Sequence, residues 1–227
     1  MSLKNRPLLQ QIRARVNRTL SDGIQHNMST EESKKMLRRH VYSKTNLVIM
    51  FVDINDSTNM SLSLSQNKFA LIMQTFAQEM SIAVSGDGGY VFKYEGDAVI
   101  SLFPAEYDQV KACKNALSCS KAMLEIIREV INPAFKAYGD ALIVLCGKNL
   151  EKAHIDIIGS SISMAAKIAS VAKPNQVLVG ELIDNIFLST PSTKNLKRFR
   201  EIGSDPNRWN YRSHINGRSI YRVYEYL

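Results

Sequence analysis

KYEGDAVISLF, residues 93–103, is the part of the sequence from which the fold can be predicted. A β-prone run opens it, a Glu-Gly-Asp turn follows, and a second apolar run closes it. This arrangement around a glycine is typical of a β-hairpin. A hairpin on the surface needs neither an aspartate at its bend nor a lysine four residues earlier, so Lys93 and Asp97 are candidates for a functional role.

Strand and helix patterns alternate on both sides of the hairpin. LVIMFVDI, residues 47–54, is typical of a buried strand, and apolar residues at helical spacing predict helices over 66–84, 105–130 and 160–172. Other short apolar runs predict further strands over 90–95, 98–103, 141–146, 154–158, 176–179 and 219–227. The order of these elements predicts an α/β fold, an α+β sandwich with one mixed sheet covered by helices.

The chain divides by charge into a basic N-terminal arm and a nearly neutral main domain. Residues 1–46 hold ten Lys or Arg against three Asp or Glu, whereas residues 47–227 hold nineteen against eighteen. We therefore expect a largely helical arm over residues 1–45 and one domain over residues 46–227. A basic amphipathic pattern over 7–24 predicts a helix that binds a partner or, less favourably, a membrane surface. Because the positive charge lies in the arm, we expect no nucleic-acid partner.

The cellular location is predicted from features that the sequence lacks. No apolar run approaches the roughly 20 residues that span a bilayer, and residues 1–20 lack the apolar stretch of a secretory signal. Cys113, Cys119 and Cys146 form an odd set without metal-ligand spacing, which is typical of buried, reduced thiols. We therefore expect a cytoplasmic protein with no transmembrane segment.

Two carboxylates come at the ends of predicted strands. Asp53 follows the apolar run LVIMFV, and Asp97 lies at the bend of the hairpin. An aspartate directly after a buried strand is costly unless it is solvated, paired or bound to a metal ion. If these strands are neighbours, both carboxylates reach one edge of the sheet, where they suit Mg²⁺ or Mn²⁺ that take further ligands from a phosphate substrate. The alternative is that Asp53 caps a helix and Asp97 only shapes a turn.

Three stretches together resemble the catalytic domain of the class III nucleotidyl cyclases. They are FVDINDST, KYEGDAVISLF and IDIIGSSISMAAKIASVAKPNQVLVGELI, and they occur in the family's order and separation over roughly residues 45–185. The resemblance implies a ferredoxin-like palm domain with a mainly antiparallel sheet, which dimerises head to tail. It also implies an adenylate cyclase that converts ATP to 3′,5′-cyclic AMP and pyrophosphate, with two Mg²⁺ or Mn²⁺ ions per site bound by Asp53 and Asp97.

The resemblance also assigns residues to the recognition of the base. Lys93 matches the family's base-recognition position on the hairpin, and Asp156, in HIDIIG, matches its partner. A lysine donor and an aspartate acceptor complement N1 and the 6-amino group of adenine, whereas guanine calls for a glutamate at the lysine position. In this family the metal aspartates come from one subunit of the homodimer and the base-recognising residues from the other. Lys93 and Asp97 would then serve opposite sites, and a monomer should be inactive.

Three positions depart from the family's pattern. Ser163 and Lys167 occupy the places of an asparagine that orients the ribose and an arginine that stabilises the transition state. A lysine keeps the charge of the arginine but loses its planar fork. Asp56 replaces a glycine beside the triphosphate loop, where a side chain is unwelcome, unless it supplies a further metal ligand. The alternative function is therefore a catalytically impaired cyclase-homology domain that binds a nucleotide or serves as a regulatory module.

The triphosphate ligands are less well defined than the metal ligands. The backbone N–H groups of NDSTN, residues 55–59, are expected to hold the triphosphate. One of Lys197, Arg200 and Arg218 is expected to contact it as well, and the sequence does not choose among them. A diguanylate cyclase, another palm-type enzyme with metal-binding carboxylates, is not favoured, because the hairpin reads YEGDA instead of GGDEF or GGEEF.

Overall fold

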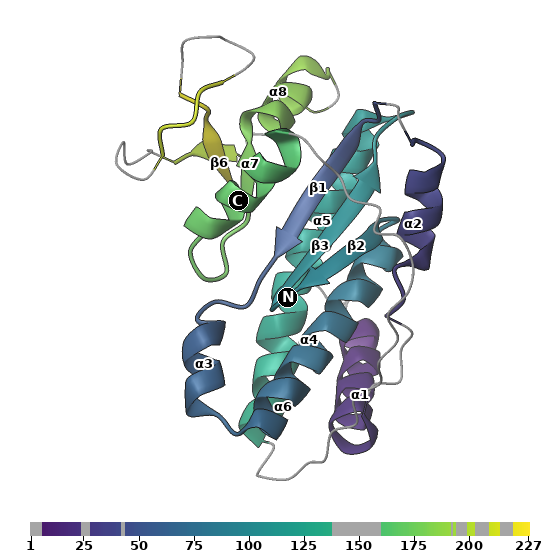
Figure 1. Cartoon of the computed structure of the whole chain (residues 1–227), viewed down its shortest axis with the longest axis vertical. Coiled ribbons are helices and arrows are strands. Elements are labelled where there is room, and N and C mark those ends of the chain that lie inside the picture. The colour runs from purple at the N-terminus through teal and green to yellow at the C-terminus, as the bar shows by residue number, and fades with distance from the viewer. Residues whose placement is uncertain are drawn as a thin grey trace.

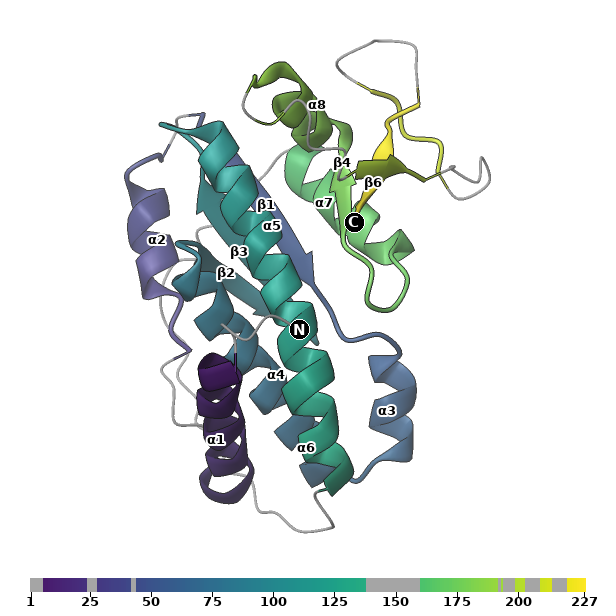
Figure 2. The same cartoon turned by 180° about the vertical axis from the view of Figure 1, so that it is seen from behind.

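A central sheet with long helices on one face stands beside a smaller unit built from the C-terminal part of the chain (Figure 1). Seen from behind, α5 runs across the back of this sheet, with α4 and α1 beside it (Figure 2). The computed structural model describes residues 6–23, 28–41, 44–137, 160–191, 193, 199–202, 209–213 and 220–227.

The helices that these residues form are α1 (Arg6–Asp22), α2 (Glu31–Arg38), α3 (Ser57–Ser63), α4 (Gln66–Gly86), α5 (Gln109–Ile126), α6 (Asn132–Ala137), α7 (Ser160–Val171) and α8 (Glu181–Ser189). The strands are β1 (Leu47–Val52), β2 (Tyr90–Glu95), β3 (Ala98–Pro104), β4 (Leu178–Gly180), β5 (Phe199–Glu201) and β6 (Val223–Tyr226).

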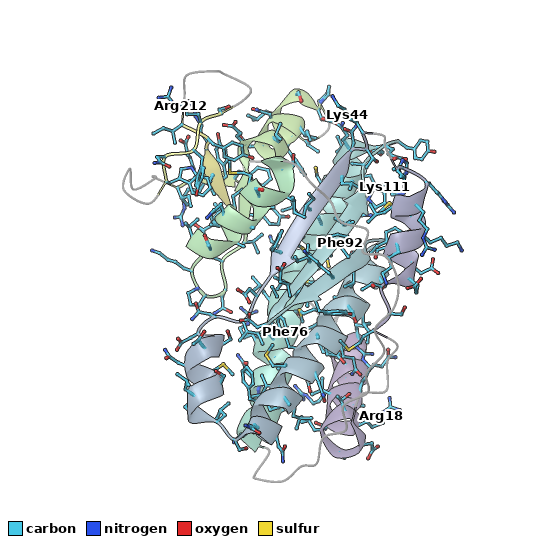
Figure 3. All side chains as sticks on the ribbon, viewed as in Figure 1. Arg18, Lys44, Phe76, Phe92, Lys111 and Arg212 are labelled. Carbon is cyan, nitrogen blue, oxygen red and sulfur yellow. The ribbon has the colours of Figure 1, made fainter. Side chains whose placement is uncertain are left out.

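The first sheet has the strand order β1-β3-β2, and both pairs of strands are antiparallel. Its strands are rich in β-branched and aromatic residues, which suits a sheet with apolar contacts on both faces. One face packs on α4 and α5 around a large core cluster that includes Phe76. The other face carries a second cluster around Phe92 and Ile100, to which α2 contributes Leu37 and α7 contributes Ile162. Figure 3 labels one member of each cluster, Phe76 and Phe92.

The second sheet has the order β4-β6-β5 and is also antiparallel. Trp209 forms its small core together with Ile168 of α7 and Val223 of β6. The indole Nε1 of Trp209 donates a hydrogen bond to the carbonyl oxygen of Tyr221 at 2.7 Å, which satisfies its polar atom inside the core. Because α7 contacts both β1 and β4, it joins this unit to the first sheet.

The amphipathic helix predicted near the N-terminus is α1, and its apolar stripe packs into the main core. Leu9, Ile12, Val16 and Leu20 are all buried there, among side chains of α4 and α5. Full burial of each such side chain contributes roughly 1.5–3 kcal/mol to the free energy of unfolding. The stripe therefore contacts the protein's own helices.

A buried ion pair also fixes α1 to α4. Glu79 of α4 is fully buried, and Arg15 of α1 donates hydrogen bonds to both of its carboxylate oxygens, from Nε at 2.9 Å and from Nη2 at 2.5 Å. Beside this pair, Gln78 Nε2 donates to the hydroxyl of Thr19 at 2.7 Å. A buried carboxylate is tolerated only when it is paired and hydrogen-bonded. The partner of Glu79 thus comes from the N-terminal arm.

A proline explains why the long helix after β3 is interrupted. Pro133 has no N–H to donate to the carbonyl oxygen of Glu129, four residues earlier. The chain forms one π-helical turn, Ile127–Ile131, before α6 begins. Arg13 of α1 donates from Nη2 to the carbonyl oxygen of Glu129 at 3.1 Å. Although α1 is this closely attached, the domain boundary at residue 45 stays a prediction.

Most elements predicted from the sequence are present, and the predicted α+β class is confirmed. The strands expected over 141–146 and 154–158 lie outside the described residues, so a single mixed sheet that includes them stays a prediction. Within the part of the chain that the structure describes, no helix is both long and apolar enough to cross a membrane.

The two cysteines within the described residues are buried and unpaired, as predicted. Burial raises the pKa of the Cys113 thiol to about 11 and that of the Cys119 thiol to about 12, with nearby Asp108 and Asp87 adding to the effect. Both side chains therefore stay protonated and unreactive near neutral pH. Cys146 lies outside the described residues.

Candidate active site

Asp53 and Asp97 lie side by side at one end of the first sheet. The last pair of β1 is Val52 with Val99 of β3, so Asp53 comes next to the turn that carries Asp97. Partial burial, then the hydrogen bond and negative charge of Asp97, raise the pKa of Asp53 from 3.8 to about 6. The backbone N–H of Ile54 opposes this rise, since it donates to Oδ1 of Asp53 at 2.9 Å. Two like charges held this close form an anionic centre that a bound cation would stabilise.

The turn sequence explains how Asp97 is presented. Glu95 pairs with Ala98, so Gly96 and Asp97 form a two-residue hairpin turn. Gly96 has a φ of +62°, a conformation that glycine adopts without steric cost. Among the described residues, no group of three His, Cys, Asp or Glu side chains is arranged to hold a metal ion. Asp53 and Asp97 are thus two carboxylates that leave room for water or phosphate ligands.

A small apolar cavity lies behind this turn, between the hairpin and α4. Its volume is about 190 Å³, and Met73, Phe76, Tyr94 and Asp97 are among the residues that line it. Pockets that hold drug-sized ligands measure roughly 300–1,000 Å³. The cavity is therefore too small and too apolar for a nucleoside triphosphate.

A β-bulge in β2 turns Lys93 away from the core that α4 and α5 cover. The register with β3 shifts between Val91 and Lys93, so Phe92 is an extra residue on β2. An inserted residue reverses which of the following side chains point to each face of a sheet. Tyr94 consequently packs on the α4 side. Lys93 lies on the opposite face, with its Nζ 5.7 Å from the centre of the Phe92 ring.

Ser163 and Lys167 share one exposed face of α7. They are four residues apart on the helix, and both side chains are exposed. Between and beside them, Ile162 packs on the first sheet and Ile168 packs on the core of the second. The apolar side of α7 thus orients its polar side outward, away from both sheets.

The sequence matches the family described as the adenylate and guanylate cyclase catalytic domain over residues 40–198, which is well over half of the chain. The chain belongs to this family. Similar proteins include an adenylate cyclase from Glutamicibacter nicotianae, 30% identical over 135 residues, a uridylate cyclase from Burkholderia cepacia, 26% identical over 159 residues, and a cytidylate cyclase from Escherichia coli, 23% identical over 164 residues.

These alignments cover only part of each protein. They include 60%, 64% and 63% of this chain and 30%, 69% and 35% of the respective relatives. The chain therefore spans about a third of the length of two of these relatives. What the three relatives share with it is the cyclase catalytic domain.

Solved structures support the fold. The adenylyl cyclase CyaB from P. aeruginosa matches with a TM-score of 0.63 at 18% identity, over 81% of this chain and 96% of that chain. A bacterial light-regulated adenylyl cyclase matches with a TM-score of 0.59 at 16% identity, over 99% of this chain and 65% of that chain. At these identities the likeness concerns the fold alone. The second match extends this likeness over nearly the whole of the present chain.

Asp56, at the position where the family's pattern has a glycine, has a backbone conformation that glycine adopts most easily. Its φ is +63° and its ψ is 26°, in the left-handed region, just before α3 begins. Aspartate tolerates this region better than most residues because its side chain can bond locally. Here Oδ1 of Asp56 accepts a hydrogen bond from Asn59 Nδ2 at 2.6 Å. Within the described residues Asp56 belongs to no three-ligand metal group, so a role as a further metal ligand finds no support.

Glu95 is a polar residue of the hairpin that sequence reasoning missed. Its Oε2 lies 3.5 Å from Nζ of Lys93, on the same face of β2. The alternation Lys-x-Glu in YVFKYE was a usable signal. The side of the sheet on which the two residues lie could not be predicted, because it depends on the bulge at Phe92.

Several predicted site residues of the cyclase domain cannot be placed. Asp156, Lys197 and Arg218 lie outside the described residues. Arg200 is described, and its guanidinium pairs with Glu225 across the second sheet. A role for Arg200 at the triphosphate would require it to leave this partner.

Proposed function

We propose that the chain is an adenylate cyclase that converts ATP to 3′,5′-cyclic AMP and pyrophosphate at a site shared between two subunits. The single observation that carries this proposal is the meeting of Asp53 and Asp97 at one end of the first sheet. In a domain of this family, a carboxylate pair at this place suits the phosphate chemistry of cyclisation.

The donor set fits Mg²⁺ or Mn²⁺, with two ions per site. Asp53 and Asp97 would hold the ions, because both are hard oxygen ligands and lie together, with the pKa of Asp53 raised by partial burial and then by the Asp97 carboxyl. When bound, the ions would lower the pKa of the attacking hydroxyl and neutralise charge on the phosphates. An aspartate with a pKa of about 6 is mostly ionised at neutral pH, so it is ready to bind them.

The remaining site residues supply binding and charge. Lys93 donates to N1 of adenine, and Asp156 accepts from the 6-amino group. Ser163 orients the ribose so that its 3′-oxygen faces the α-phosphate. Lys167 stabilises the negative charge that develops on the α-phosphate as pyrophosphate leaves, although as a point charge and without a bidentate fork. The exposure of both residues on one face of α7 is compatible with contact to a ligand held by a second subunit.

A homodimer is part of the proposal. The family resemblance implies a head-to-tail dimer, and the cavity behind Asp97 is too small for the substrate. Asp53 and Asp97 of one subunit would then work with Lys93 and Asp156 of the other. Each hairpin would contribute to two sites, with its lysine in one and its aspartate in the other.

Two other functions are supported by specific observations. Ser163, Lys167 and Asp56 favour a catalytically impaired domain that binds a nucleotide or regulates a partner. The names of two relatives, a uridylate cyclase and a cytidylate cyclase, favour a pyrimidine nucleotide as substrate. In both cases the metal aspartates keep the same role.

The test is incubation of the purified chain with ATP, CTP, GTP or UTP and either Mn²⁺ or Mg²⁺, with cyclic products identified by mass spectrometry. Cyclic AMP as the main product supports the proposal. Cyclic CMP or UMP as the main product favours the pyrimidine alternative. Nucleotide binding without any product favours the impaired domain.

The shared site has a separate test. Asp53→Asn and Asp156→Ala should each abolish turnover while leaving the dimer intact. When the two inactive variants are mixed and exchange subunits, one site of each mixed dimer regains all its native groups. If a demonstrably mixed dimer, isolated with two affinity tags, shows no activity, the shared site is wrong.

A further inference from the structure

The face of the hairpin opposite α4 carries two oppositely charged groups at a spacing that suits a common ligand. Lys93 and Glu95 are two residues apart and therefore lie on the same face of β2, with Nζ and Oε2 3.5 Å apart, and the bulge at Phe92 makes this the face opposite α4. A charge-assisted hydrogen bond is shorter, about 2.7–2.9 Å. The side chains are 37% and 66% exposed. The contact between the two side chains is therefore long enough to leave Glu95 able to turn toward a ligand that approaches this face.

The pair lies beside apolar residues of the second core cluster. The ring of Phe92 lies beside Lys93 and is almost fully buried in the second core cluster. α7 packs on the same face of the sheet through Ile162, and it begins four residues after Asp156. The hairpin face that carries Lys93 and Glu95 thus borders the second core cluster and the helix that carries Ser163 and Lys167.

We propose that Glu95 is a specificity-determining residue that reads the base of the substrate together with Lys93. This inference rests on the proposed function, which places Lys93 opposite a ring nitrogen of the base. An ammonium group only donates hydrogen bonds, and a carboxylate only accepts them. With Lys93 on the ring nitrogen, Glu95 accepts from one N–H of the neighbouring exocyclic group, which must then be an amino group, and the second N–H of that group is left for Asp156.

The substrate class that follows is the nucleoside triphosphates with amino bases. Adenine and cytosine both present an unprotonated ring nitrogen beside an amino group. Guanine and uracil present a ring N–H and a carbonyl oxygen in these places, so an ammonium group would face a donor and a carboxylate would face an acceptor. Buried polar groups left unpaired in this way are costly, and the penalty falls on binding. CTP is therefore the competitor that this pair distinguishes least from ATP.

The test measures binding separately from turnover. 3′-Deoxy forms of ATP, CTP, GTP and UTP lack the attacking hydroxyl, and their dissociation constants can be measured in the presence of Mn²⁺ by calorimetry. The wild-type chain should bind the adenine and cytosine nucleotides at least about tenfold more tightly than the other two. In Glu95→Gln, the side-chain amide both donates and accepts, so this preference should fall about tenfold. Glu95→Asp should bind all four nucleotides more weakly but keep the same order of affinities.

A matched control is Glu201→Gln, which removes a similarly exposed carboxylate from a looser ion pair, 3.9 Å from Arg222 in the second sheet. It should leave all four affinities unchanged. The proposal is overturned if the wild type prefers guanine or uracil, which would place Lys93 on a carbonyl oxygen and Glu95 on a ring N–H. It is also overturned if Glu95→Gln weakens all four nucleotides equally or has no effect.

Failure of the proposed function gives a different pattern. The chain could bind amino bases selectively and lose this selectivity in Glu95→Gln, yet cyclise no natural nucleotide. The role of Glu95 in base recognition would then be supported, and the catalytic proposal would be wrong. If the chain cyclises GTP or UTP best, catalysis stands and the role of Glu95 is wrong. If no nucleotide binds at all, both proposals are wrong.

Discussion

Replacing Asp53 with asparagine should stabilise the metal-free protein at neutral pH. The side-chain amide of the variant would keep the oxygen that accepts the hydrogen bond from the Ile54 N–H, but the substitution removes a charge that lies beside Asp97. Burial and the Asp97 carboxylate raise the pKa of Asp53 from 3.8 to about 6. At about 1.4 kcal/mol per pKa unit this corresponds to about 3 kcal/mol. Because Asp53 is only partly buried and remains accessible to solvent, solvent screening reduces the expected gain to about 1 kcal/mol.

The pH dependence gives the sign of this effect. An aspartate in the unfolded chain titrates near 3.8, whereas Asp53 in the folded chain titrates at about 6. Between these values the folded state binds more protons, so the free energy of unfolding falls as the pH rises. Asp53→Asn should therefore raise this free energy at pH 7.5 and change it little at pH 4. The measurement is urea unfolding in EDTA, followed by circular dichroism.

Divalent cations should reverse the order of stability, so that the wild type becomes more stable than Asp53→Asn. Mn²⁺ at about a hundredfold over its dissociation constant would stabilise the wild type by about 2.7 kcal/mol, and Asp53→Asn should lose most of this gain. Asp108→Asn is the control, since Asp108 is another exposed aspartate, which caps α5 by accepting from the Lys111 N–H at 2.8 Å. The reasoning is refuted if Asp53→Asn is less stable than the wild type in EDTA at pH 7.5. It is equally refuted if Mn²⁺ stabilises both proteins to the same extent.

Three further predictions concern α1, the loop before α3, and α7. Arg15→Met leaves the fully buried carboxylate of Glu79 without its charged partner and should lower the free energy of unfolding by about 3 kcal/mol, or Tm by roughly 6–12 °C. Adding Glu79→Gln to the same chain should restore at least half of this loss, and a fall in Tm below about 1 °C would contradict the attachment of α1 through this pair. Asp56→Gly releases a residue held at φ +63° and should raise Tm by about 2 °C, whereas a lower Tm would mean that its local hydrogen bond outweighs the strain. Lys167→Arg, combined with Ser163→Asn, should raise kcat at least about tenfold with little change in KM, and an unchanged kcat would remove both residues from the catalytic proposal.

The periodic parts of the fold could be predicted because burial imposes a repeat on the sequence. α4 was predicted over 66–84 and occurs as Gln66–Gly86, and α7 was predicted over 160–172 and occurs as Ser160–Val171. The proximity of two strand-end carboxylates could also be predicted, since it needs only that β1 and β3 are neighbours. These inferences depend on patterns a few residues long, which the sequence contains in full.

Other features depend on contacts between distant segments and could not be predicted. Glu79 lies in a helix pattern and suggests a solvent-exposed position, yet it is fully buried because Arg15, 64 residues away, pairs with it. The bulge at Phe92 could not be predicted from the sequence either, since an aromatic residue fits either face of a sheet. The bulge decides on which side of the sheet Lys93 and Glu95 lie, so their proposed role in recognising the base depends on one inserted residue that has no local signature.

The three residues that depart from the family's pattern have one physical property in common. Asp56, Ser163 and Lys167 are all exposed, so packing does not determine their identity. Asp56 even occupies a backbone conformation that glycine adopts at lower cost. The proposed function gives these exposed residues a common role, since it places them beside the ribose and the phosphates of the substrate. On this proposal Ser163 and Lys167 affect catalysis and not folding, whereas Asp56 also affects stability through its backbone conformation. The rates of the Lys167 and Ser163 variants will distinguish a working cyclase from a domain that only binds its nucleotide.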